Sequence, residues 1–288
     1  MTSEHPAHPA LALIIEAETT PVFRYATEAV ETTLAVASQL EPQTMPPALV
    51  ARLAQRFGDV LLQAGELDRA ATWLLTASQQ LARVDRSFRV RQAALNARLH
   101  AARGQLDAAA ESVTRGWKFF EADGGPRQLT TGLEIAASEV DLRRGVFGPV
   151  IERLEPLLRT KGAFADIDTV WRAHRLLGRA HHARLNLARA RELFQAAADL
   201  SALHGAQQDE ADALISLGQC AIGLEELDDG LAHIQKAYEL SAGGSQTFRD
   251  AIGALVSANL VEGDINGALD AIRTAGVRAA QADDYVAF

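Results

Sequence analysis

The chain has 288 residues, of which 48% are hydrophobic and only 6% are aromatic. This is enough apolar material for a sizeable core, and its bias toward alanine and leucine favours close-packed helices over a β-sandwich. The formal net charge of −9 excludes sequence-independent nucleic-acid binding, because that function needs a basic surface.

Membrane and export signals are weak in this sequence. The apolar run at residues 10–15 is too short to cross a membrane. No basic residue precedes it, since the first one is Arg24, so a secretory n-region is missing. Cys220 is the only cysteine, which excludes an internal disulfide. We therefore expect a cytoplasmic protein without a membrane partner, and the preference for arginine and alanine suggests a bacterial source.

The N-terminal part is expected to precede the regular architecture. Residues 1–9 hold two prolines and no apolar periodicity, which predicts a disordered lead-in. Thr20 followed by Pro21 is typical of a helix start, and apolar residues then recur at helical spacing to about residue 40. Residues 10–46 are thus predicted to form a pair of capping helices.

A short turn sequence recurs through the rest of the chain. It begins at residues 65, 104, 145, 185, 225 and 263, so the spacing ranges from 38 to 41 residues. Such an even spacing predicts an internal repeat of six helix pairs. The six sequences read GELDRA, GQLDAA, GVF, LNLARA, EELDDG and GDINGA.

The small residues of this repeat have physical reasons. Glycine at the turn supplies a left-handed backbone conformation at the end of the first helix. Within the first helix, Gly58, Gly178 and Gly218 occupy matched positions. Glycine inside a helix costs about 1 kcal/mol relative to alanine, so these positions indicate that two helices cross closely there.

The turns also carry recurring carboxylates. Asp68, Asp107, Asp228 and Asp264 stand at or next to the start of the second helix of their pairs. We expect them to accept hydrogen bonds from the N–H groups that open the helix, or to interact with them. Their recurrence at one repeat position argues against acid–base catalysis.

The fourth pair carries the clearest resemblance to a known family. His174-x2-Leu177-Gly178-x2-His181, followed by Ala190-x3-Phe194, is similar to the tetratricopeptide repeat pattern, with two histidines in place of aromatic residues. The spacing of about 40 residues resembles that of the longer tetratricopeptide repeats of bacterial sensor and adaptor proteins. The resemblance implies that the first helices of the pairs line a concave groove.

The predicted fold is an all-α, right-handed α-solenoid of about six helix pairs behind the N-terminal cap. The apolar end, Tyr285-Val-Ala-Phe288, leaves three readings open: folding back on the last pair, self-association through the C-terminal end, or membership of a longer chain. The predicted repeats are about 47–86, 87–126, 127–165, 166–205, 206–244 and 245–288.

Signatures of catalysis and of metal binding are missing. The sequence has no phosphate loop, dinucleotide fingerprint, nucleophile elbow or HExxH motif, so we expect no enzyme activity, cofactor or metal. His174, His181 and His182 lack the i, i+4 spacing of helical metal ligands. We interpret His174 and His181 as packing histidines with satisfied ring nitrogens, and Cys220 as a small core residue.

A row of basic residues is the candidate partner site. Arg172, Arg175, Arg179 and His182 lie at i, i+3, i+7 and i+10, which places them on one helical stripe. Arginine suits carboxylates, so the stripe favours an acidic partner segment. The alternative is a solvated arginine face that pairs with nearby Glu and Asp. The full candidate set is Arg91, Arg98, Arg143, Arg172, Arg175, Arg179 and His182.

Two functions follow from this reading. The first is a non-catalytic protein–protein interaction scaffold or adaptor that binds a partner segment in the groove. The second is a ligand- or peptide-responsive sensor module that regulates a separate effector. Sensors of this kind hold peptide backbone with a row of asparagines, and Asn96, Asn186, Asn259 and Asn266 form no such row. Gln55 and Asp59 replace the residues of a carboxylate clamp, so an adaptor for chaperone tails is not supported.

Overall fold

The computed structural model describes residues 46–80, 85–123, 128–160, 164, 167–241 and 245–281. Within these ranges all regular structure is helical, which confirms the all-α class. The predicted lead-in, all of the capping helices except residue 46, and the apolar C-terminal end lie outside the described residues. No helix in the described ranges is long and apolar enough to span a membrane.

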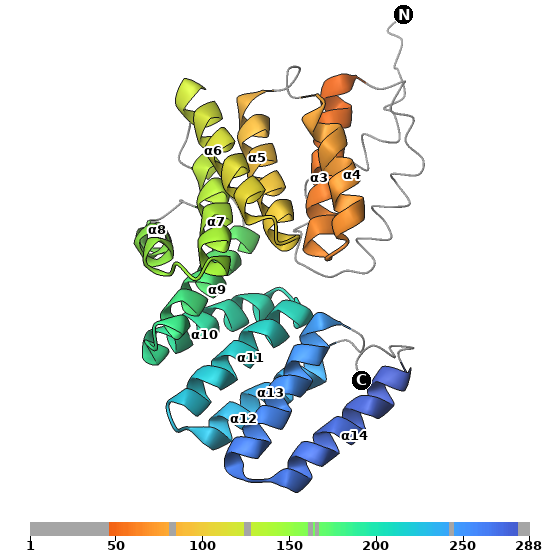
Figure 1. Ribbon diagram of the computed structural model, residues 1–288, viewed down its shortest axis with the longest axis vertical. Helices are drawn as coiled ribbons and strands as arrows, with labels where there is room; N and C mark the ends of the chain where they lie inside the picture. Colours follow the sequence, from red (N-terminus) through yellow and green to blue (C-terminus); the bar gives the residue numbers. More distant parts are fainter. Residues whose placement is uncertain are drawn as a thin grey trace, which may run out of the picture. The chain divides into compact units, whose positions relative to one another are not determined.

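The described helices follow one another in pairs joined by short turns (Figure 1). Odd-numbered helices are the first helices of their pairs and even-numbered helices are the second. The bounds are α3 Pro47–Gln63, α4 Leu67–Ser78, α5 Arg86–Ala102, α6 Leu106–Asp123, α7 Gln128–Arg143, α8 Gly148–Arg159, α9 Ile167–Ala183, α10 Leu187–Leu203, α11 Gln207–Gly223, α12 Leu227–Leu240, α13 Gln246–Glu262 and α14 Ile265–Gln281.

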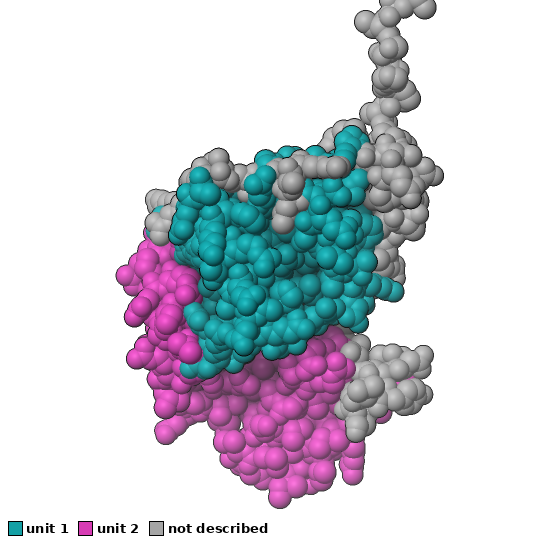
Figure 2. Space-filling view, turned by 45° about the horizontal axis from the view of Figure 1, so that its top comes forward, with its two compact units in different colours: residues 1–145, 160–169 teal, residues 146–159, 170–288 magenta. Residues whose placement is uncertain are grey.

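The chain divides into two compact units, residues 1–145 with 160–169 and residues 146–159 with 170–288 (Figure 2). In the first unit, α4 packs against α3 and α5, and α6 packs against α5 and α7. In the second unit, α12 packs against α11 and α13, and α14 packs against α13. Within these units α4, α6 and α12 each lie between their own first helix and the next one, which is the stacking of an α-solenoid.

The turn that ends each first helix has the predicted left-handed residue. Gly65, Gly104, Gly145 and Gly263 have φ between 74° and 84°. In the two turns without glycine at this place, Leu185 and Glu225 adopt φ of 60° and 66°. The turn geometry therefore persists without glycine, at the energetic cost of a side chain in the left-handed region.

The predicted close crossings are present in three pairs. A Cβ atom at Gly58 would lie 2.6 Å from the side chain of Leu74, and one at Gly178 would lie 2.8 Å from the ring of Phe194. A Cβ at Gly218 would lie 2.6 Å from Ile234. In each case the neighbour belongs to the second helix of the same pair, so the glycines are required by helix packing.

The turn carboxylates differ in their roles. Asp264 accepts a hydrogen bond from the backbone N–H of Gly267 at 2.9 Å, as predicted for a cap. Asp68 lies in the first turn of α4 and accepts a hydrogen bond from Arg103 at 2.6 Å. Asp107 accepts one from Arg144 at 2.6 Å. Since both arginines follow the next first helix, these two aspartates link neighbouring pairs.

Candidate functional site

Two of the predicted groove arginines converge on one carboxylate. Arg98 Nη1 lies 3.3 Å from Asp59 Oδ1, and Arg91 Nη2 lies 3.3 Å from Asp59 Oδ2. The side chains of Arg98 and Asp59 are 12% and 8% exposed, whereas that of Arg91 is 55% exposed. Arg98 therefore joins α5 to α3 through this ion pair. Of the two arginines, only Arg91 is largely exposed to solvent.

Arg143 is different. It is the last residue of α7, it is exposed, and it forms no ion pair with any residue in the described part of the chain. It belongs to the same compact unit as Arg91 and Arg98, while the remaining candidates belong to the other unit.

The remaining candidates lie on α9, on the side of the helix away from its core. Arg172, Arg175 and His182 are half-buried, and Arg179 is exposed. Burial lowers the pKa of the His182 imidazole, which favours its neutral form. The buried residues of α9 are Trp171, Ala173, Leu176, Leu177, Gly178, Ala180 and His181.

Arg175 has both an acidic and an aromatic neighbour. Its Nη2 donates to Asp212 Oδ1 of α11 at 3.1 Å, and its Nε also pairs with this carboxylate. Its guanidinium carbon lies 5.4 Å from the ring centroid of Trp171. The stripe is thus partly neutralised within the chain, as the alternative of a solvated and paired face anticipates.

The predicted packing histidines have the expected ring contacts. His174 Nδ1 lies 2.9 Å from the carbonyl oxygen of Val170. His181 Nε2 lies 3.4 Å from Glu155, and its Nδ1 lies 3.2 Å from the side chain of Asn186. Burial raises the pKa of Glu155, but hydrogen bonds from Arg189 and His181 outweigh burial and leave that pKa below its usual value.

The other residues considered for chemistry are also structural. Cys220 is fully buried, and burial raises the pKa of its thiol to about 11, so it is a core residue as predicted. In the described part of the chain, no group of three or more His, Cys, Asp or Glu is placed to hold a metal ion.

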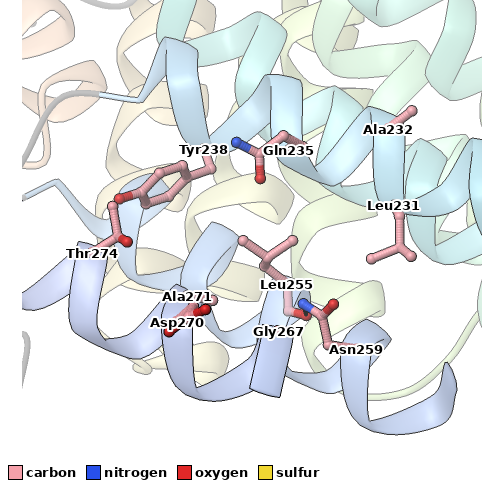
Figure 3. A pocket seen from close by; sticks show the side chains of 10 residues that line it. All are labelled: Leu231, Ala232, Gln235, Tyr238, Leu255, Asn259, Gly267, Asp270, Ala271 and Thr274. Atoms are coloured by element: carbon pink, nitrogen blue, oxygen red, sulfur yellow. Dashed lines mark hydrogen bonds between the residues drawn. The ribbon is translucent and has the colours of Figure 1, made fainter. Parts of the chain in front are cut away.

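A pocket that the sequence did not indicate lies between α12, α13 and α14 (Figure 3). Its volume is about 470 Å³, and its lining mixes apolar side chains such as Leu231 and Leu255 with polar ones such as Gln235 and Asn259. Tyr238 also lines it, but the Tyr238 hydroxyl is buried and has no hydrogen-bond partner in the described residues. No local motif marks this pocket, because three helices build it.

Comparisons with known proteins identify structures of similar fold but no relative by sequence. No protein-family model matches the chain, and no curated protein matches it. Among solved structures, a Rap protein complexed with Competence and Sporulation Factor has a TM-score of 0.64 and 11% identity, with 96% of this chain and 76% of that chain covered. NprR in complex with its cognate peptide NprX has a TM-score of 0.56 and 9% identity, with 96% and 81% covered.

A third similar structure contains a tetratricopeptide repeat sensor. A signal transduction ATPase with numerous domains from Pyrococcus horikoshii, which has a tetratricopeptide repeat sensor, gives a TM-score of 0.57 and 14% identity. The likeness covers 88% of this chain and 47% of that protein. At such identities the likeness concerns the fold. Together with the stacked pairs, the left-handed turns and the glycine crossings, it establishes that this chain has the fold of tetratricopeptide-repeat proteins.

Proposed function

We propose that the chain is a non-catalytic cytoplasmic scaffold that binds an acidic segment of a partner protein on the surface of its first helices. The observation that carries this proposal is the α9 stripe. Arg172, Arg175 and Arg179 stand in one row, accessible in part or in full, above a face of the same helix that is buried. Arginine is suited to carboxylates, because its planar guanidinium presents its N–H donors in a fixed fork that matches the two carboxylate oxygens.

Exposure decides which arginines of α9 a partner can reach. Arg175 is half-buried and contacts Asp212, so it helps to position the surface. Arg179 on the same helix is exposed, so its guanidinium is accessible to an external carboxylate. The binding energy of such contacts is salt-dependent, since exposed charges are screened.

The test is selection of ligands from a random peptide library, followed by binding measurements on the selected peptides at low and high salt. We expect peptides rich in Asp and Glu, and a loss of affinity of tenfold or more in the Arg172→Glu, Arg179→Glu double variant, which changes two arginines of the α9 stripe. The control is Arg69→Glu with Arg115→Glu, which changes two exposed arginines of second helices. Equal affinity of both double variants would refute the proposal.

The sensor function is the second candidate. It is favoured by the likeness to NprR in complex with its cognate peptide, which extends over 96% of this chain. Against the sensor function, three asparagines of this chain already make contacts within it. Asn96 donates to Ser78, Asn186 contacts His181, and Asn259 donates to the carbonyl of Leu255. Hydrogen exchange with the selected peptide separates the two functions: protection confined to first helices fits a scaffold, and changes throughout both units fit a sensor.

A further inference from the structure

Four repeat positions change from covered to exposed in the last helix pair. They lie three residues before the left-handed turn residue and two, six and nine residues after it. In the five earlier pairs, every residue at these positions is buried or half-buried. In the last pair all four are exposed and apolar, with exposed fractions from 42% to 65%. These four, which we call the terminal face, are Leu260, Ile265, Leu269 and Ile272.

The earlier pairs show what normally covers these positions. In the first pair they are occupied by Leu62, Leu67, Ala71 and Leu74, which form one cluster with Leu95 and Leu99 of α5. In the fifth pair, Ile222, Leu231 and Ile234 cluster with Leu255 and Ala258 of α13. The face is therefore a docking surface for the next helix, repeated along the chain, and its last example has no described helix against it.

The surface chemistry points to a second copy as the occupant. Outside this neighbourhood, the large exposed apolar side chains of the described residues are scattered: Leu75, Val146, Leu185 and Leu203. The best apolar match for the terminal face in another copy is the same face, and such a contact closes with two-fold symmetry. The charged residues of α14 are Asp270, Arg273 and Arg278, so the helix has no part in the acidic excess of the chain.

We propose that two copies of the chain pair through their terminal faces, so that α14 of one copy packs on the other copy where the next helix packs in the earlier pairs. From their exposed fractions, the four side chains offer roughly 400 Å² per copy, or about 800 Å² for the pair, which is below the roughly 1,000 Å² of a stable specific interface. The pairing is therefore weak and depends on concentration. Three of the four residues of the terminal face lie on α14, a second helix, and Leu260 lies near the end of α13, so the face shares no residue with the α9 stripe of the proposed binding surface.

Analytical ultracentrifugation of the full chain from about 1 to 200 μM tests the pairing. We expect a monomer–dimer equilibrium in this range, weakened at least tenfold by Ile265→Asp with Leu269→Asp. The matched control is Leu75→Asp with Leu203→Asp, which changes two other exposed leucines, 61% and 79% exposed, and should leave the equilibrium unchanged. Circular dichroism of each variant checks that the helices remain folded.

Two results would overturn the proposal. One is a monomer at every concentration, and the other is a dimer equally sensitive to both double variants. If the full chain is monomeric and a chain ending at residue 281 dimerises, the terminal face is covered by the chain's own last residues rather than by a second copy. A chain that binds no acidic peptide could still form the dimer measured here, so the two proposals can be refuted separately.

Discussion

Arg98 and Asp59 form an ion pair between α3 and α5 in which both side chains are largely withdrawn from solvent. The Asp59 carboxylate also accepts a hydrogen bond from Gln63 at 3.1 Å and one from Arg91 at 3.3 Å. A buried charge is costly without its partner, so these contacts have structural consequences for the first-helix surface.

Replacing Asp59 with alanine should destabilise the protein by about 3 kcal/mol, because the Arg98 guanidinium remains buried without a counter-charge. Arg91→Ala removes a half-exposed arginine from the same carboxylate and should cost less than about 1 kcal/mol. Urea denaturation followed by circular dichroism measures both. Similar losses for the two variants would contradict the structural role of Arg98.

Glycine should stabilise the two turns that lack it. Leu185 and Glu225 hold the left-handed conformation with a side chain, and Leu185 is 81% exposed, so its replacement sacrifices little packing. We expect Leu185→Gly and Glu225→Gly each to raise the free energy of unfolding by about 1 kcal/mol. The reverse change, Gly65→Ala, should lower it by a similar amount, and thermal melts of the three variants give the comparison.

Two helical glycines should respond oppositely to alanine. Gly178→Ala places a methyl group against the ring of Phe194 and should cost about 2 kcal/mol or more. Gly253 lies on an exposed part of α13, where an added methyl group would meet no atom within 4 Å, so Gly253→Ala should stabilise by about 0.5–1 kcal/mol. Partial rescue of Gly178→Ala by Phe194→Leu would identify the ring as the obstacle, whereas no rescue would point to the backbone.

Lowering the pH should weaken the contribution of Glu155 to the stability of the fold. Its pKa in the folded chain is below the usual 4.5, so its stabilising effect is fully present above pH 4.5 and is lost as pH falls through the folded-state value. The stability difference between wild type and Glu155→Gln should therefore shrink below pH 4.5. Denaturation curves between pH 3 and 7 test this, with the exposed Glu152→Gln on the same helix as a control. A difference that is constant over this range would contradict the assignment.

Much of the fold could be predicted from the sequence because its determinants are local. The left-handed turn residues, the helix periodicity and the small residues at Gly58, Gly178 and Gly218 each act within one helix pair. A repeated turn every 38–41 residues then implies stacking, since a single pair cannot bury its own apolar face.

The charged contacts could not be predicted in the same way. Whether Asp68 caps α4 or reaches Arg103, and whether Arg98 faces a partner or Asp59, depends on the rotation and offset of neighbouring helices. A side chain moves by about 100° around the helix axis for each residue of shift, so the spacing alone does not decide these pairings.

The sequence by itself determined that the chain is built of stacked helix pairs, because backbone conformation and steric size are written in each repeat. Only the tertiary structure decided which arginines are already paired and which apolar residues stay uncovered. The residues of the terminal face resemble those at the same positions of the first and fifth pairs, and Ile272 is exposed whereas Ile234 clusters with Leu255 and Ala258 of α13. Exposure depends on the neighbouring repeat, and that neighbour is not encoded in the residue itself.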